Sequence, residues 1–318
     1  MPNLNKNLEK DLKKVESLMR KNLSKEPVVS DLYDYIFNKS GKKVRASISL
    51  ISSYGMNKNQ QNRVKLAAII ELLHTATLVH DDIVDNSDLR RGRTTVNVAW
   101  SNSHGVLIGD FIYSKAFMLM NEIGNLKVVD ELSSATNKIA EGEIMQLGNK
   151  SNLDISLQQL KRISYYKTGR LFEASAKSAA MLSNKSISFI ENISKAAKLI
   201  GIAFQVRDDL LDYGISKGNI GKPEMQDILE DKITYPLYFA LKSSSKKDTS
   251  RILKKIKNKD FNAEEVSEFV SSSDAFNKCN SLIQTYSNEI NKCINKLSNK
   301  EIRNEMLNLS ESLKNRYE

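Results

Sequence analysis

The residues best suited to chemistry are two groups of three aspartates with the pattern Asp-Asp-x-x-Asp. One group is Asp81, Asp82 and Asp85, and the other is Asp208, Asp209 and Asp212. A helix turns by about 100° per residue, so the first and last aspartates of a group share one face. Each group follows an apolar run, 66–79 and 199–206, where clustered negative charge is costly. One such motif is equally compatible with a solvated acidic patch, but two point to bound divalent cations, above all Mg²⁺ carrying phosphates.

Cationic and polar residues accompany both groups. His74 lies two helical turns before Asp81, and Gln205 precedes Asp208 on the same face. The basic residues nearby are Arg90 and Arg91 after the first group, Lys222 after the second, and Lys42, Lys43 and Arg45 earlier in the chain. Each alone is typical of a surface charge. Together they favour a polyanionic ligand whose phosphate oxygens are shared by Mg²⁺ and the basic side chains.

Helices must position these residues, because Gly (13) and Pro (4) are scarce and apolar residues recur at helical spacing. We expect helices over about 4–23 and 31–37, a turn over 40–45 that leads into a helix ending near 54, and further helices over about 61–85, 106–123, 128–147, 157–182 and 187–213, and again from about 233 onward. Segments 86–93 and 214–227 are expected to be loops, with Glu26 and Pro27 ending the first helix. The helix over 61–85 is apolar nearly all round and should be central. Both aspartate groups then lie at helix C-termini, where negative charge opposes the helix dipole and again points to a cation.

Composition narrows the class of protein. Hydrophobic residues make up 40% of the chain, which is enough for a sizeable core. The net charge is +10, but the sequence shows no nucleic-acid-binding motif, so we expect no nucleic-acid partner. Cys279 and Cys293 would lie about 21 Å apart on one helix, so we expect free thiols. The most apolar run contains Glu71 and is too short to span a bilayer, and the N-terminus lacks an apolar signal core. We therefore expect one cytoplasmic helical domain over 1–318.

At this point the motifs resemble those of trans-polyprenyl diphosphate synthases, most of all the bacterial octaprenyl members. Residues 71–92 are similar to the first aspartate-rich region of that family and residues 204–212 to the second. Further matching segments, in the family's order, are Gly41–Arg45, Gly109–Asp110, Glu141–Glu143, Lys167–Phe172 and Gly221–Pro223. The resemblance is clear over about 20–245. Departures are Ser40 and Ala46, where the family usually has Gly and Pro, and Met225 and Asp231, where it has Gly.

The resemblance implies an all-α isoprenoid-synthase fold, a helical bundle around a central cavity, in a homodimer that binds three Mg²⁺ ions. It implies condensation of isopentenyl diphosphate with an allylic diphosphate. The implied metal ligands are Asp81 and Asp85, supported by Asp82, on one side, and Asp208, with Asp209 and Asp212 less directly, on the other. Arg90, Lys167, Thr168, Gln205 and Lys222 would hold the allylic diphosphate, and Lys42, Arg45, His74 and Arg91 the isopentenyl diphosphate. The implied catalytic set is Asp81, Asp82, Asp85, Asp208 and Lys167.

Product length is implied by the residue five positions before the first aspartate. In this family a bulky aromatic residue there closes the product cavity and gives short products. Here that residue is Ala76, followed by Thr77, so we expect a long product of roughly C30 to C50. The resemblance to the octaprenyl members implies octaprenyl length, for quinone side chains. We also expect transient contact with a membrane surface when this product is released.

Other functions share parts of the pattern. A short-chain geranylgeranyl diphosphate synthase carries the same motifs. A class I terpene cyclase also uses Asp-Asp-x-x-Asp with Mg²⁺, but it usually has a different second motif and lacks an isopentenyl site, so Asp208, Arg45 and His74 argue against it. A subunit of a heteromeric synthase typically lacks the aspartate motifs, which are both intact here.

Overall fold

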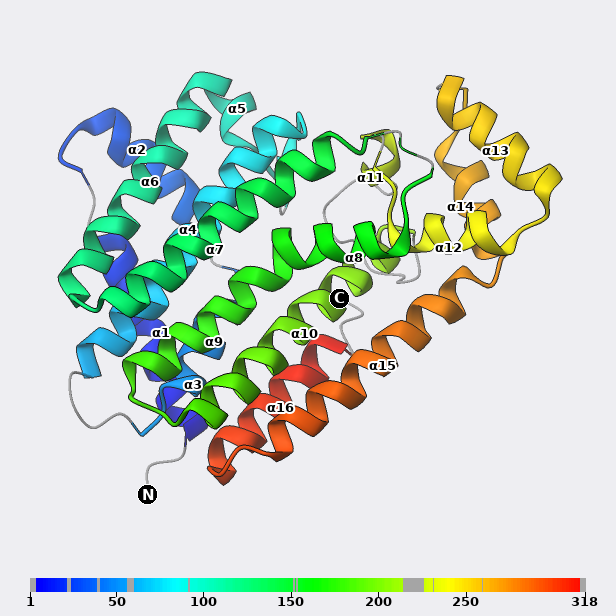
Figure 1. Ribbon diagram of the computed structural model, residues 1–318. Coiled ribbons are helices and arrows are strands. Elements are labelled where there is room, and N and C mark those ends of the chain that lie inside the picture. Colours follow the sequence, from blue (N-terminus) through cyan, green and yellow to red (C-terminus); the bar gives the residue numbers. More distant parts are fainter. Residues whose placement is uncertain are drawn as a thin grey trace.

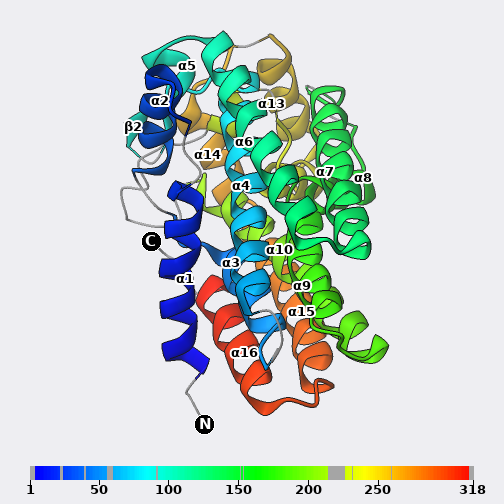
Figure 2. The ribbon, with the colours of Figure 1, turned by 90° about the vertical axis from the view of Figure 1, so that its left-hand side faces the viewer.

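The structure is a computed structural model that describes residues 4–21, 24–38, 41–55, 60–90, 92–150, 152, 154–213, 226–230, 232–258 and 260–314. Its elements are α1 (Leu4–Lys21), α2 (Pro27–Phe37), α3 (Val44–Ser52), α4 (Gln60–Val84), β1 (Leu89–Arg90), β2 (Arg93–Thr94), α5 (Val96–Ala99), α6 (Asn102–Ile123), α7 (Leu126–Leu147), α8 (Leu157–Ser164), the π-helix η1 (Tyr165–Gly169), α9 (Arg170–Leu182), α10 (Ile187–Leu211), α11 (Gln226–Leu229), α12 (Tyr235–Ser243), α13 (Lys246–Asn258), α14 (Ala263–Ser271), α15 (Ala275–Asn295) and α16 (Lys300–Lys314). The all-α class expected from the sequence is confirmed, and the long helices run side by side (Figures 1 and 2).

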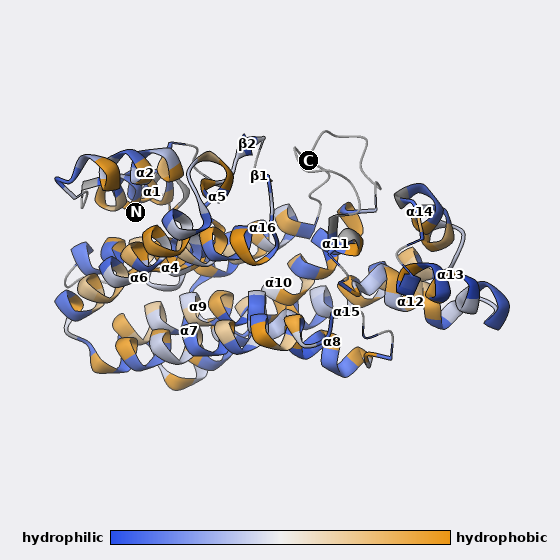
Figure 3. Ribbon diagram, turned by 90° about the horizontal axis from the view of Figure 1, so that it is seen from above, coloured by the Kyte–Doolittle hydropathy of each residue, from blue (hydrophilic) through white to orange (hydrophobic). Residues whose placement is uncertain are grey.

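Helix α4 is the central element of the bundle, as its apolar sequence predicts. It buries residues on nearly all of its faces and packs against α1, α3, α6 and α9. Figure 3 shows α4 and α6 side by side, with α1 and α2 on one side of them and α7 and α9 on the other. Apolar side chains of these helices form one large core, and those of α3, α9, α10, α15 and α16 form a second. The first aspartate group is therefore carried by a helix that is packed on nearly all sides.

Helices α4 and α6 run antiparallel and very close together. Lys65 Nζ lies 2.7 Å from Glu122 Oε2 near one end of the pair. Near the other end, a Cβ atom added to Gly109 would lie 2.2 Å from Nε2 of His80. A side chain at position 109 therefore cannot fit while His80 keeps its place, and the backbone of α6 lies directly beside the residue that precedes Asp81.

Helix starts differ from the predicted ones where capping residues act. Helix α2 begins at Pro27, which has the fixed φ suited to a first helical turn, so Pro27 starts this helix instead of ending the preceding one. Helix α6 begins four residues earlier than expected, because the Ser101 hydroxyl accepts the N–H of His104 at 3.3 Å.

Three further expectations were wrong. The segment over 86–93 is not only a loop, since Leu89 pairs with Thr94 and Arg90 with Arg93 in a two-stranded hairpin in which Gly92 has a φ of 70°. The helix predicted over 157–182 is interrupted by the π-helix η1. Of the loop predicted over 214–227, the described residues 226 and 227 belong to α11.

Two expectations about cysteines and membranes can be compared with the structure. Cys279 and Cys293 both lie on α15 and are free and buried, as predicted. In the part of the chain that the structure describes, no helix combines the length and the apolar character needed to cross a membrane.

Candidate active site

The first aspartate group lies at the C-terminal end of α4, and two of its carboxylates bind cations from elsewhere in the chain. Asp82 is buried, and its Oδ1 accepts a hydrogen bond from Nε of Arg90 at 2.5 Å. Asp85 Oδ2 accepts from Nζ of Lys232 at 2.8 Å. Lys232 is buried and also binds Glu230 at 2.5 Å. The group is thus linked to the β1–β2 hairpin on one side and to the segment before α12 on the other.

The hairpin that carries Arg90 is held by the N-terminal part of the chain. The hydroxyl of Tyr35 on α2 donates to the carbonyl of Thr94 at 2.7 Å. The guanidinium of Arg93 lies over the ring of Tyr35, 4.3 Å from its centre. The hairpin that holds Arg90 against Asp82 is therefore itself bound to α2 through Tyr35.

The second aspartate group lies at the C-terminal end of α10 and continues into a chain of hydrogen bonds. Thr168 Oγ1 donates to Gln205 Oε1 at 2.7 Å, and Gln205 Nε2 donates to Asp209 Oδ1 at 2.8 Å. The other carboxylate oxygen of Asp209 accepts the backbone N–H of Tyr235 at 3.1 Å. Both oxygens of buried Asp209 therefore bind protein groups, and Asp209 fixes Gln205 and, through it, Thr168.

The π-helix η1 presents Lys167 and Thr168. Nζ of Lys167 lies 2.8 Å from Glu143 Oε2 and also donates to Gln146 Oε1, so two side chains of α7 hold it. A Cβ atom on Gly142 would lie 3.0 Å from the backbone N of Lys167, so α7 and η1 are in direct backbone contact. Isolated π-turns inside helices are rare and occur often at functional sites.

Electrostatic effects show that four elements meet at Asp81. Burial and, after it, the charge of the Glu143 carboxylate raise the pKa of Asp81 to about 7, although Lys167 and Arg90 act in the opposite direction. These groups come from α4, α7, η1 and the hairpin. A carboxylate with a raised pKa beside a second carboxylate is a location where an added cation would be favourable.

Asp227 connects the two aspartate groups. Burial and then the charge of Asp227 raise the pKa of Asp209 to about 8. Burial alone would lower the pKa of Lys232, but Asp85, Asp227 and Glu230 raise it above its ordinary value. Because Lys232 also binds Asp85, the ends of α4 and α10 converge on one site, as their shared motif predicts.

A separate pair of basic side chains, Arg45 and His74, lies about two turns before Asp81 along α4. Nη1 of Arg45 lies 2.9 Å from Nε2 of His74, and its guanidinium lies 4.6 Å from the centre of the Phe172 ring. The N–H of Ala46 donates to the buried Glu71 Oε1 at 2.9 Å. Proline, which the family usually has at position 46, lacks an N–H and could not make this bond. The replacement by Ala46 therefore adds a hydrogen bond to Glu71.

The other predicted residues are placed as follows. Lys42 is exposed, and Lys43 binds Glu16 at 3.0 Å. Ala76 is fully buried in the first core, and the hydroxyl of Thr77 donates to the carbonyl of His74 at 2.8 Å. The predicted residues Arg91 and Lys222, and the departures Ser40, Met225 and Asp231, lie outside the described residues.

Lys232, Glu143 and Gln146 are site residues to which the sequence analysis gave no role. Glu143 and Gln146 are three residues apart and lie on one face of α7. This spacing in the sequence could have indicated that both side chains bind the same group. Lys232 carries no local signal, because its partner Asp85 is 147 residues away. Among the described residues, no three His, Cys, Asp or Glu side chains are grouped closely enough to hold a metal ion by themselves.

Comparison with known proteins places this site in a family. The family model described as polyprenyl synthetase matches residues 26–272. Octaprenyl diphosphate synthase of Escherichia coli (strain K12) is 41% identical over 214 residues, which are 67% of this chain and 66% of that relative. The all-trans-nonaprenyl-diphosphate synthase (geranyl-diphosphate specific) of Rhodobacter capsulatus is 40% identical over 222 residues, 70% of this chain and 68% of that one.

A solved structure extends the likeness to the whole described fold. The crystal structure of polyprenyl synthase from Caulobacter crescentus CB15, complexed with calcium and isoprenyl diphosphate, has a TM-score of 0.93 at 28% identity. It covers 99% of this chain and 98% of its own. The family model alone matches well over half of the sequence, and the helical fold agrees with it. The chain therefore belongs to the polyprenyl synthetase family and is a prenyltransferase.

Proposed function

We propose that the protein condenses isopentenyl diphosphate with an allylic diphosphate, such as farnesyl diphosphate, into a long all-trans polyprenyl diphosphate. The observation that carries this proposal is that Arg90, Lys167 and Lys232 surround the first aspartate group, while the charge of Asp227 acts both on Lys232 and on Asp209 of the second group. Clustered carboxylates beside cations suit a diphosphate bound through divalent metal. The solved relative is a polyprenyl synthase complexed with calcium and isoprenyl diphosphate, which supports this assignment.

The reaction breaks the allylic C–O bond and leaves an allylic cation and a pyrophosphate. The isopentenyl double bond attacks the cation, and the adduct then loses a proton, which we assign to the departing pyrophosphate. Arg90, Lys167 and Thr168 would donate to the oxygens on which negative charge grows, with Gln205 and Lys222 assisting. Lys167 must first exchange Glu143 and Gln146 for the diphosphate. The close packing of α4 on α6 would help to keep water from the cation.

The donor set fits Mg²⁺. Asp81, Asp85 and Asp208 offer carboxylate oxygens, which hard divalent cations prefer, and the raised pKa of Asp81 marks negative charge that the protein leaves poorly compensated. Because the described carboxylates form no three-ligand group, the ions would be held jointly with the substrate. Bound Mg²⁺ would stabilise the charge on the leaving diphosphate. We propose three ions, with Asp82, Asp209 and Asp212 supporting the direct ligands.

Arg45 and His74 are the proposed core of the isopentenyl diphosphate site, with Lys42 and Arg91 completing it. The contact between Arg45 and His74 supports this role because it places two diphosphate donors side by side. The Phe172 ring under the guanidinium fixes its plane and favours its charged form.

Product length is the finer part of the proposal. Ala76 is buried and lies five residues before Asp81, about 7.5 Å along the helix axis, where a growing apolar chain would extend away from the diphosphates. Small Ala76 and Thr77 favour a long product, and octaprenyl length, for use in quinone side chains, is our proposal. Relatives that bear the names octaprenyl and nonaprenyl synthase match this chain almost equally well, so product mass is the decisive measurement.

The assembly we propose is a homodimer built on α6, with residues 1–318 acting as one catalytic domain. Leu107 and Met118 on α6 are 67% and 66% exposed, although both are large apolar side chains. They are eleven residues apart and therefore share one face of the helix, which a second copy of the chain would cover. Free, buried Cys279 and Cys293 support a reducing compartment, and we propose the cytoplasm with transient membrane contact on product release.

The test is an assay of the purified protein with radiolabelled isopentenyl diphosphate, farnesyl diphosphate and Mg²⁺. We expect label to enter a long polyprenyl product, and chelation by EDTA to stop the reaction. Consumption of the allylic substrate without uptake of label would identify a cyclase instead. Activity that appears only when a second protein is added would identify a heteromeric synthase and overturn the homodimer.

A further inference from the structure

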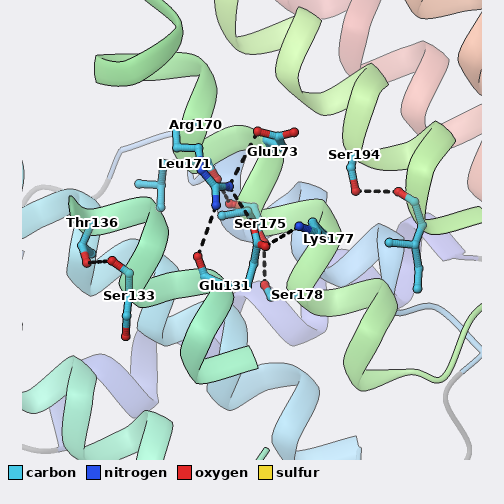
Figure 4. Close-up of polar contacts among 12 residues, drawn as sticks. Glu131, Ser133, Thr136, Arg170, Leu171, Glu173, Ser175, Lys177, Ser178 and Ser194 are labelled. Carbon is cyan, nitrogen blue, oxygen red and sulfur yellow. Dashed lines mark hydrogen bonds and ion pairs between the residues drawn. The ribbon is translucent and has the colours of Figure 1, made fainter. Parts of the chain in front are cut away.

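A buried ion cluster lies directly beneath η1. Nη1 of Arg170, the first residue after the π-helix, lies 2.6 Å from Glu131 Oε1 on α7 and 3.6 Å from Glu173 Oε2. The other oxygen of Glu131 lies 2.5 Å from Nζ of Lys177 (Figure 4). Tyr165, the first residue of the π-helix, donates its hydroxyl to Glu173 at 2.6 Å. Glu173 thus binds the residues on both sides of the turn that presents Lys167 and Thr168.

Stability alone does not account for this cluster. The side chains of Arg170 and Glu131 are 9% and 6% exposed, and burying such a pair costs about as much as its attraction returns. The best-attested use of a buried ion pair is to select one register among alternatives. A π-turn competes with an uninterrupted α-helix, which has one residue fewer in the same turn. A change from one to the other would rotate the side chains that follow by about 100° for this one-residue shift.

We propose that Arg170, through Glu131 and Glu173, is a positioning residue for the allylic diphosphate: it holds η1 in the π register that presents Lys167 and Thr168. This inference rests on the proposed function. Arg170 is buried and its guanidinium is bound by carboxylates, so it acts through η1 and not by touching the substrate. Lys167 reaches Glu143 and Gln146 only if η1 keeps this register against α7.

The first test measures KM for each substrate in Arg170→Met. We expect KM for farnesyl diphosphate to rise about tenfold, while KM for isopentenyl diphosphate changes by less than about twofold. The conservative Arg170→Lys should recover part of the loss, because it restores the charge but not the planar guanidinium that contacts Glu131 and Glu173 together. If Arg170→Met does not fold, Glu173→Gln, which keeps the size of the side chain and weakens the same bonds, is measured instead with the same expectation.

The second test asks whether Arg170 acts through Lys167. In the Lys167→Ala background the change Arg170→Met should raise KM for farnesyl diphosphate several-fold less than in the wild type, because one of the two positioned groups is already gone and only Thr168 remains. A matched control is Arg63→Met. Arg63 and Asp11 form a pair of the same burial, with both side chains 9% exposed and 3.0 Å apart, at the opposite end of α4. This control should lose stability and leave both KM values unchanged.

The outcomes separate this inference from the proposed function. A wild-type protein that makes no prenyl product overturns the proposed function itself. An active wild type whose Arg170→Met variant raises both KM values equally, or neither, overturns the positioning role. Equal effects of Arg170→Met with and without Lys167 would also overturn it, because they would show that Arg170 acts independently of η1.

Discussion

Lys232 is the cation that connects the two aspartate groups, and Lys232→Met removes its charge while keeping most of its aliphatic volume. Its side chain is 7% exposed, and those of its partners Asp85 and Glu230 are 17% and 13% exposed. Removing one partner of a buried pair costs about 3 to 5 kcal/mol. Because both carboxylates keep some contact with water, we expect the unfolding free energy to fall by about 3 kcal/mol, the lower end of this range.

The assay is thermal unfolding in EDTA and then at increasing Mg²⁺, without substrate. In EDTA the variant should melt about 6 °C lower than the wild type, since a chain of this size shifts by about 2 °C per kcal/mol. In the variant Asp85, Glu230 and Asp227 lack an internal cation. We therefore expect Mg²⁺ to raise the melting temperature of Lys232→Met more than that of the wild type, where Lys232 already binds Asp85.

The control is again Arg63→Met, whose pair with Asp11 is buried to a similar extent but lies far from the aspartates. It should be destabilised in EDTA, and Mg²⁺ should shift its melting temperature only as much as that of the wild type. The reasoning is refuted if Mg²⁺ shifts all three proteins equally, because Lys232 would then have no connection with the metal ligands. It is equally refuted if Lys232→Met is as stable as the wild type in EDTA.

Four further predictions concern the metal ligands, the product, pH and assembly. Asp81→Ala and Asp208→Ala should each lower turnover by about two orders of magnitude or more, and near-wild-type rates would remove these residues from the metal site. Ala76→Phe should shorten the product on chromatography, and an unchanged length would refute the position of the product chain. Burial raises the pKa of Asp81 to about 7 from an ordinary 3.8, so the folded protein holds this proton more tightly than the unfolded one. The stability contributed by the protonated Asp81 carboxyl is therefore complete below pH 3.8 and is lost as pH rises to about 7. Urea unfolding in EDTA should find that Asp81→Asn becomes increasingly more stable than the wild type over this pH range. Leu107→Glu with Met118→Glu should convert a dimer into monomers in light scattering, and an unchanged mass would exclude the α6 interface.

Local patterns in the sequence were sufficient for much of the fold and for the motifs. Apolar spacing predicts α4 and its central place, because burial on all faces requires an apolar residue at nearly every position. The two aspartate groups predict their own convergence, because only shared ligands make such charge tolerable on two apolar helices. The pairing of Arg45 with His74 agrees with their joint assignment to one substrate, although they are 29 residues apart.

Other features depend on contacts that no local pattern records. The π-helix adds one residue to a single turn, and the sequence of 157–182 predicts one helix without revealing this residue. Its causes are tertiary: Arg170 binds Glu131, 39 residues away, and a Cβ atom on Gly201 would lie 2.8 Å from Cα of Gly169. Lys232 is one of 48 Lys and Arg residues, and it is buried, as are Arg63, Arg170 and Arg207, which no local pattern in the sequence predicts.

Helix α6 contacts the aspartate-bearing helix α4 on one face and exposes apolar side chains on the other. On its inner side Gly109 rests against His80 without a side chain to absorb displacement, and on its outer side Leu107 and Met118 face away from the bundle. A helix is about 10 Å across, so whatever covers the outer face lies one helix width from Asp81. Because Gly109 contacts His80 directly, a displacement of α6 would press on α4 next to Asp81. Separating two copies at α6 should therefore slow turnover before it unfolds the chain.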